Sequence, residues 1–161
     1  MSTLVPSGDL RNLNLGRYVQ GKTTTIVAGG GTFQLFTVAG GEVLITALWG
    51  KVTTAITLAG ETLKLTVDPT SGATVDISTV SADIGTTDTA AGNLITGLLD
   101  VDGTTNLPIV SVGANQPFTF VCPTGEIELE VNNGAGTEDG VVEWYCTYVP
   151  LTPGATVVAS A

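Results

Sequence analysis

The stretch that decides the fold is residues 32–67, TFQLFTVAGGEVLITALWGKVTTAITLAGETLKLTV. Valine, isoleucine, threonine and aromatic residues dominate it, and these residue types favour a pleated, half-buried surface. Glycines at positions 40, 41, 50 and 60 interrupt the apolar runs, and glycine supplies the backbone conformations that tight turns need. The stretch therefore predicts a meander of neighbouring strands that starts a sheet. The expected strands cover residues 32–38, 42–49, 52–58 and 61–67.

Short apolar runs separated by turn signals continue to the C-terminus. Asp-Pro at positions 68–69 and Asp-Gly at positions 102–103 mark two of these turns. Because no run has a convincing helical pattern, we expect an all-β chain folded as an antiparallel β-sandwich of the jelly-roll type. The remaining expected strands cover residues 23–28, 73–80, 93–101, 107–112, 116–121, 125–131, 141–150 and 155–159.

Residues 125–131, GEIELEV, show the clearest alternation in the chain. This pattern predicts a half-buried strand with an apolar face and a wet acidic face. The apolar face holds Ile127, Leu129 and Val131, and the acidic face holds Glu126, Glu128 and Glu130. An acid–base pair or a calcium surface is an alternative use of the glutamates, but alternating like charges are more typical of a solvated strand face.

With 161 residues, the chain is long enough for one domain with a real core. We expect a single β-sandwich domain over residues 23–161, preceded by an extended N-terminal arm over residues 1–22. The arm contains scattered leucines, glycines and three of the five basic residues, and such a segment can reach a partner. The candidate partner-binding residues on it are Leu10, Arg11, Leu13, Leu15, Arg17 and Lys22.

The net charge of −10 is unevenly distributed along the chain. The first 64 residues hold all five basic residues and three acidic ones, whereas the rest of the chain holds the other twelve of the fifteen acidic residues. A body this acidic repels phosphates, so we expect no nucleic-acid partner. No apolar run approaches the roughly 18–20 residues that a membrane-spanning helix needs, so we expect no membrane partner.

Residues 16–23, GRYVQGKT, match the phosphate-loop pattern letter for letter. That motif works only between a buried strand and a helix, where glycine amides surround the phosphates and the lysine reaches them. Here the preceding residues form no continuous strand pattern, and the following TTTIV is β-branched and resists helix formation. Nucleotide binding is therefore not the expected function.

The other sequence patterns that could indicate a metal site or a catalytic site are weak. Asp100 and Asp102 resemble part of a calcium loop, but the glycine comes too early and the distal glutamate is missing. The chain has no histidine, which removes Ser-His and Cys-His nucleophilic sites and histidine-based zinc sites. We expect no enzyme activity, catalytic site, cofactor or metal. Cys122 and Cys146 fall in predicted strands and are expected to be buried free thiols, with a disulfide as the alternative.

Four aromatic residues have two possible uses: they can anchor the core or an interface, or they can stack on sugar rings. They are Trp49, Trp144, Tyr145 and Tyr148.

Three segments of the chain resemble segments found in the same order in small β-rich virion proteins of tailed bacteriophages. They are residues 35–56 (LFTVAGGEVLITALWGKVTTAI), 126–129 (EIEL) and 142–151 (VEWYCTYVPL). Several proteins of that group are capsid decoration, or cement, proteins. The resemblance implies a non-enzymatic structural protein that is made in the host cytoplasm. It would then decorate and stabilise the capsid exterior, bound to the major capsid protein as a homo-oligomer, with a trimer expected. The alternative is a tail- or fibre-associated adhesion module that binds host surface glycans.

Overall fold

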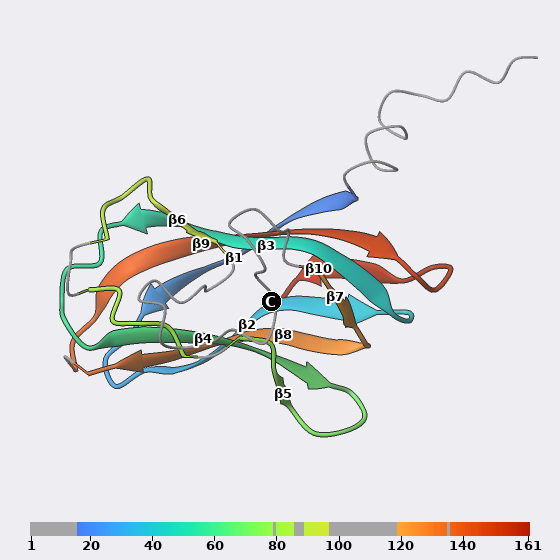
Figure 1. Cartoon of the computed structure of the whole chain (residues 1–161), viewed down its shortest axis with the longest axis horizontal. Coiled ribbons are helices and arrows are strands. Elements are labelled where there is room, and N and C mark those ends of the chain that lie inside the picture. The colour runs from blue at the N-terminus through green and yellow to red at the C-terminus, as the bar shows by residue number, and fades with distance from the viewer. Residues whose placement is uncertain (1–15, 79, 86–88, 97–118, 135) are drawn as a thin grey trace, which may run out of the picture.

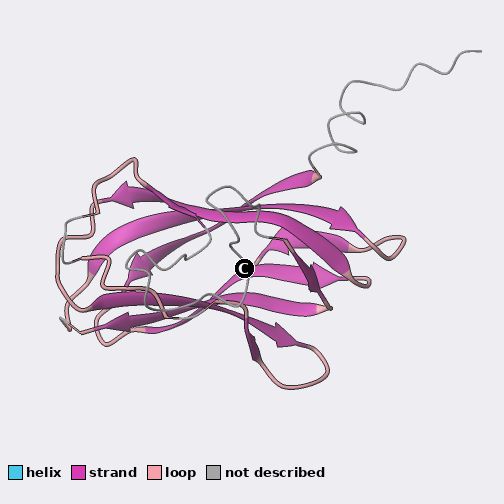
Figure 2. Cartoon of the chain, viewed as in Figure 1, coloured by secondary structure: helices cyan, strands magenta, loops and turns pink. Residues whose placement is uncertain are grey.

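The computed structural model describes residues 16–78, 80–85, 89–96, 119–134 and 136–161. Within them every regular element is a strand, and the strands form two antiparallel sheets that face each other (Figures 1 and 2). The expected all-β sandwich class is confirmed. The strands are β1 (Arg17–Ile26), β2 (Gly31–Ala39), β3 (Val43–Thr54), β4 (Glu61–Pro69), β5 (Val75–Asp76), β6 (Leu94–Thr96), β7 (Phe120–Cys122), β8 (Gly125–Asn133), β9 (Asp139–Pro150) and β10 (Thr156–Ala159).

Several expected features lie outside the described residues. They are the strand at residues 107–112, most of the strand at 116–121, the Asp100 and Asp102 pair, and the candidate partner-binding residues Leu10, Arg11, Leu13 and Leu15.

The strand order shows that partners come from distant parts of the chain. Sheet A has the order β1-β9-β3-β6, and β7 also pairs with β3, whereas sheet B has the order β10-β2-β8-β4-β5. The pairs are nested: β1 with β9, β2 with β8, β3 with β6 and β7, and β4 with β5. Successive strands β1 to β4 therefore alternate between the two sheets.

The predicted meander is wrong, because β2, β3 and β4 are not neighbours in one sheet. β2 and β4 flank β8 in sheet B, while β3 lies between β9 and β6 in sheet A. Each of these strands has one apolar side, and crossing from sheet to sheet buries that side of every strand in the shared core. The local pattern identifies the strands but carries no information on which distant strand each one pairs with.

Gly50 does not make the predicted turn, because β3 runs through it without a break. A Cβ atom at Gly50 would lie 2.6 Å from Cγ1 of Val142 and 3.2 Å from the indole ring of Trp144. The glycine is therefore a packing residue that lets β9 place its tryptophan in the core.

A β-bulge in β3 controls which of its side chains face outward. The register with β9 shifts between Ile45 and Ala47. Val43 and Ile45 are buried before the shift, and Leu48 and Val52 are buried after it. Because a one-residue shift exchanges the faces of a strand, the bulge turns the even-numbered positions inward and leaves Trp49 on the outer side.

β1 begins at Arg17, earlier than the strand that the sequence predicts at residues 23–28. Residues 17–22 are therefore part of sheet A, and the predicted arm can include only residues that precede this strand. The register shift between Gln20 and Thr23 interrupts the alternation, and this bulge hides the strand in the sequence. Gly21 sits at the bulge, where a Cβ atom would lie 2.5 Å from the ring of Phe36.

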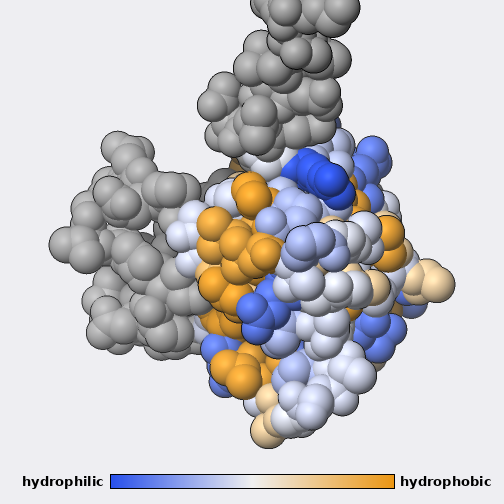
Figure 3. Space-filling view, turned by 90° about the vertical axis from the view of Figure 1, so that its right-hand side faces the viewer, coloured by the Kyte–Doolittle hydropathy of each residue, from blue (hydrophilic) through white to orange (hydrophobic). Residues whose placement is uncertain are grey.

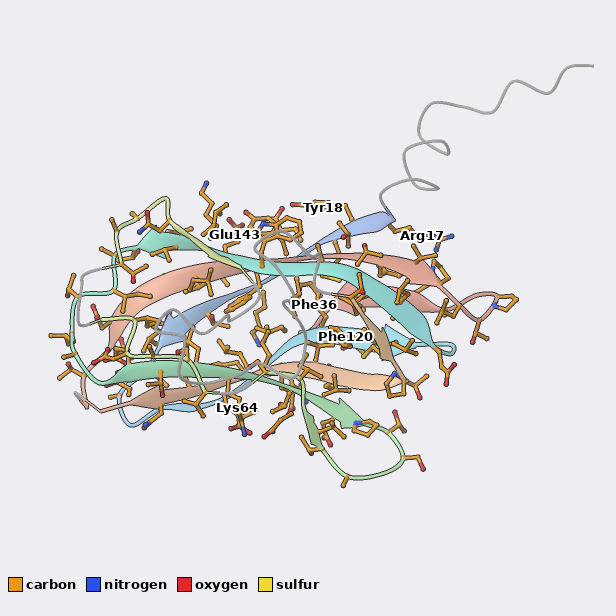
Figure 4. The ribbon with its side chains drawn as sticks, viewed as in Figure 1. Arg17, Tyr18, Phe36, Lys64, Phe120 and Glu143 are labelled. Atoms are coloured by element: carbon orange, nitrogen blue, oxygen red, sulfur yellow. The ribbon has the colours of Figure 1, made fainter. Side chains whose placement is uncertain are left out.

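The core between the sheets is built by alternating side chains of the long strands. On β9 the buried residues are Val142, Trp144, Cys146 and Tyr148, and the indole nitrogen of Trp144 donates a 2.9 Å hydrogen bond to Oγ1 of Thr24. Phe36 of β2 projects into the same space between the sheets (Figure 4). The alternating patterns thus supply a continuous apolar layer that keeps both sheets rigid.

The strand predicted at residues 73–80 is reduced to the two residues of β5. Beyond β5, serine side chains accept hydrogen bonds from main-chain amides at the edge of β4. Ser78 Oγ accepts a hydrogen bond of 2.7 Å from the Leu65 amide, and Ser81 Oγ accepts one of 2.9 Å from the Leu63 amide. The main-chain amides of Ser78 and Ser81 also donate hydrogen bonds to the carbonyls of Leu65 and Leu63, so side chains and main chain together cover this edge. They also protect an edge that would otherwise invite pairing with another chain.

The packing role of Gly50 leads to a test. We expect Gly50→Ala to lower the free energy of unfolding by about 1–3 kcal/mol, because the added methyl group overpacks the core against Val142 and Trp144. The matched control is Gly31→Ala at the start of β2, where the nearest atom to a new Cβ is 3.9 Å away. Urea denaturation of both variants measures the effect, and equal stabilities would contradict it.

Candidate interaction surfaces

The outer face of sheet B is acidic. Glu126, Glu128 and Glu130 point outward from β8, while Ile127 and Leu129 are buried, as the alternation predicts. β4 adds Asp68, which lies opposite Glu126.

Part of this charge is balanced within the sheet. Lys64 forms ion pairs of 2.9 Å with Glu130 and 3.0 Å with Asp76, and it lies on the outer side of sheet B (Figure 4). Glu126 accepts hydrogen bonds from Thr37 at 3.0 Å and Ser160 at 2.9 Å.

Partial burial and neighbouring negative charges change proton binding on this face. Partial burial, followed by the negative charges of Asp68, Glu126 and Glu130, raises the pKa of Glu128. Among the described residues, no group of three or more acidic or cysteine side chains is arranged to hold a metal ion. Glu126, Glu128 and Glu130 thus form a charged, half-exposed sheet face.

The outer face of sheet A differs, because three aromatic rings meet on it. The rings of Trp49 and Tyr145 stack with centroids 5.4 Å apart, and Tyr18 lies 6.0 Å from Tyr145 and 6.3 Å from Trp49. They come from three adjacent strands, β1, β9 and β3, with Trp49 directly opposite Tyr145. We call these three residues the aromatic cluster.

Polar groups border the aromatic cluster. The Glu143 carboxylate accepts a hydrogen bond from the Tyr145 hydroxyl at 2.5 Å and another from the side-chain amide of Gln20. The hydrogen bond to Glu143 raises the pKa of Tyr145 to about 12, so the phenol stays protonated as a donor. Lys51 lies opposite Glu143 in the β3–β9 register and is exposed. The cluster therefore combines flat rings with groups that donate and accept hydrogen bonds.

The structure divides the four aromatic residues that the sequence singles out. Trp144 and Tyr148 are core anchors, whereas Trp49 and Tyr145 are on the outer face. Tyr18 completes the cluster, and sequence analysis missed it because residues 17–22 were assigned to the arm. The alternating pattern of β1 could have identified Tyr18 if it had been continued through the bulge toward the start of the strand.

Exposed and half-buried aliphatic side chains gather at one end of sheet A. Leu44 lies directly opposite Val121 of β7 and Val149 of β9, so the three share the outer face. Val121 is 55% exposed, and the nearby Leu151 is 49% exposed. Figure 3 views this end of the sandwich and shows apolar surface gathered on one side of it. We call these four residues the apolar end group.

The two described partner-binding candidates, Arg17 and Lys22, lie in different surroundings. Arg17 starts β1 beside Tyr148, at the end of the sandwich that carries the apolar end group, and it is exposed (Figure 4). Lys22 lies within β1, and its ammonium donates a 2.7 Å hydrogen bond to the main-chain oxygen of Ala161. Only Arg17 is therefore placed together with the exposed apolar side chains.

The phosphate-loop string at residues 16–23 runs into β1, which continues as a strand to Ile26. Residues 17–26 form a strand that pairs with β9 on both sides of its bulge, so they do not form the loop and helix N-terminus that phosphate binding requires. The β-branched residues therefore continue a strand, as the sequence predicts, and do not begin a helix. None of the described residues forms a helix long and apolar enough to cross a membrane.

Both cysteines are buried free thiols, as the sequence predicts. Burial raises the pKa of Cys122 to about 12 and that of Cys146 to about 12. Reactive cysteines need a lowered pKa and access to solvent, so these two serve as small core residues.

No protein-family model, curated protein or solved structure matches the chain. The resemblance to phage virion proteins therefore depends on the sequence segments alone, and the function given below is a proposal.

Sequence analysis also missed Glu61, the first residue of β4. This side chain is fully buried, and neither carboxylate oxygen has a hydrogen-bond partner. Burial, followed by the negative charges of Asp139 and Asp83, raises its pKa. Those two aspartates accept backbone amide hydrogen bonds from residues 57–58 and 60–61, respectively, so they organise the chain before β4.

The position of Glu61 predicts an unusual pH dependence. Because its pKa is higher in the folded than in the unfolded chain, its ionisation weakens the fold as pH rises above the unfolded value of about 4.3. We therefore expect Glu61→Gln to be more stable than the wild type at pH 7 and to lose this advantage toward pH 4. Urea denaturation at both pH values measures it, with Glu42→Gln as a control at an exposed glutamate. A Glu61→Gln variant that is less stable at pH 7 would refute the argument.

Proposed function

We propose that this chain is a non-enzymatic structural protein of a tailed-phage virion. In this proposal it decorates the outside of the capsid and stabilises it by binding the major capsid protein. The nested strand pairs support the jelly-roll part of the expectation, since a jelly roll is a long antiparallel hairpin wrapped across two sheets. The phage resemblance of residues 35–56 and 142–151 supplies the virion context.

The observation that carries the proposal is the contrast between two surfaces. The outer face of sheet B carries three glutamates from β8, whereas the apolar end group places exposed and half-buried aliphatic side chains from β3, β7 and β9 on one surface. Clustered exposed apolar side chains favour contact with another protein surface, while an acidic face favours solvent. A decoration protein needs both, because one surface binds the shell and the rest keeps the particle soluble.

The location of Arg17 supports the apolar end group as the shell-binding surface. The chain enters β1 at Arg17, beside the apolar end group (Figure 4). We propose that the candidate residues Leu10, Arg11, Leu13 and Leu15 bind the same partner as the apolar end group. An apolar centre flanked by arginines is a frequent composition for a protein–protein interface.

Shell stabilisation does not require tight binding by each copy. Many copies that bind only the assembled shell add their binding free energies, and the sum opposes the internal pressure of packaged DNA. A homotrimer, which the resemblance implies, would present three apolar end groups to one local site on the lattice.

The alternative function, adhesion to host glycans from a tail or fibre, is favoured by one observation. The aromatic cluster and Glu143 lie together on the outer face of sheet A and combine ring faces with hydrogen-bonding groups. This feature can also operate on a decoration protein, because it is separate from the apolar end group.

A binding experiment tests the proposed function. We expect Val121→Glu to weaken binding to shells of the major capsid protein at least tenfold, which corresponds to about 1.4 kcal/mol, because it places a charge in an apolar contact. The matched control is Val75→Glu on β5, where the valine is 57% exposed, compared with 55% for Val121. Co-sedimentation of each variant with purified phage heads measures the binding.

Removal of residues 1–15 is the companion variant, because it keeps β1 intact, unlike a cut after residue 22. We expect this truncation also to weaken shell binding while circular dichroism stays that of a folded β protein. Wild-type protein that fails to bind the heads would overturn the proposed function. Normal binding by both Val121→Glu and the truncation would overturn the assignment of the binding surface.

A further inference from the structure

The aromatic cluster is a surface that shell binding through the apolar end group leaves unused. Its three residues are far apart in the sequence, and only the β1-β9-β3 strand order brings them together. Tyr18 is 53% exposed, while Trp49 and Tyr145 are half-buried. Thr46 and Thr147, whose hydroxyls are 2.7 Å apart, lie between the cluster and the apolar end group along β3 and β9.

The cluster is held in place by the sheet beneath it. Trp49 and Tyr145 face each other across the two central strands of sheet A, and the stacked rings limit each other's movement. The Tyr145 hydroxyl is further fixed by Glu143. A rigid aromatic surface loses little conformational entropy when a ligand binds to it.

The chemistry at the edge of the cluster suggests the kind of ligand. A carboxylate can accept about four hydrogen bonds, and Glu143 uses two of these positions for Gln20 and Tyr145. The Gln20 amide and the Lys51 ammonium add polar groups at the same edge. A sugar ring matches this arrangement, since its C–H face packs on aromatic rings and its hydroxyl groups form charge-assisted hydrogen bonds with a carboxylate.

The charge of the protein limits which ligands can bind to the aromatic cluster. Lys51 balances the charge of Glu143 beside the rings, so it is the net charge of −10 on the chain that disfavours a sialylated or phosphorylated ligand. Nucleobases also stack on aromatic side chains, but their phosphates face the same repulsion. From these observations we infer that Tyr18, Trp49 and Tyr145, with Glu143 and Gln20, form a binding site for a neutral pyranose ring of a surface glycan.

Tryptophan fluorescence provides a direct test on the full-length chain. Of the two tryptophans, Trp144 is 1% exposed in the core, so a change of emission on ligand addition reports Trp49. The probes are methyl glucoside, methyl galactoside, methyl N-acetylglucosaminide and their neutral oligomers, with sialyllactose as the charged comparison. We expect saturable titration by at least one neutral sugar and at least tenfold weaker binding of sialyllactose.

Variants show whether the cluster is responsible. Tyr18→Ala removes an exposed ring and Glu143→Gln removes the charged acceptor, and each is expected to weaken neutral-sugar binding at least tenfold. Val158→Ala on β10 is the matched control, because this residue is 51% exposed on the opposite sheet, and its affinity should equal that of the wild type. Circular dichroism checks that each variant is folded.

Absence of titration by every neutral probe would overturn the inference, as would equal binding of sialyllactose. Unchanged affinity in both Tyr18→Ala and Glu143→Gln would also overturn it. Phage-head binding by the same two variants separates this inference from the proposed function, because it should be normal if the aromatic cluster takes no part in shell binding.

Discussion

The register between β3 and β9 is the constraint on which the rest of the structure depends. These strands pair along most of their length, and the shift between Ile45 and Ala47 decides which residues of β3 face the core. Gly50 then leaves the space in which Trp144 packs, while Trp49 and Tyr145 are paired on the outer side. One register therefore determines the centre of the core and the composition of the outer face of sheet A.

The sandwich that results has surfaces of different character. The outer face of sheet B holds charges that solvent and a few internal partners stabilise, and Lys64 is held between Glu130 and Asp76. Within the described residues, the outer face of sheet A carries Glu143, the aromatic cluster and the apolar end group. A sandwich with exposed apolar and aromatic side chains on one sheet and charges on the other is consistent with the proposed role as a structural component of a virion.

The sequence predicted the strands better than their partners. The alternation in residues 125–131 fixed both the strand and its acidic face, because a period of two needs only local information. Gly50 was misassigned as a turn, since a glycine required by a distant tryptophan looks the same as a glycine required by local backbone geometry. Tyr18 was missed because the bulge after Gln20 breaks the alternation, and the cluster itself depends on pairing between segments more than one hundred residues apart. Glu61 could not have been identified, because its burial depends on packing that no local pattern records.

Electron cryomicroscopy of the purified phage particle tests the central claim most directly. The account predicts many copies distributed over the head, with Leu44, Val121 and Val149 against the shell and Glu126, Glu128 and Glu130 facing solvent. Density for the chain on the tail alone, or its absence from the particle, would contradict the proposed function. Copies on the head with the acidic face of sheet B against the shell would contradict the assignment of its surfaces.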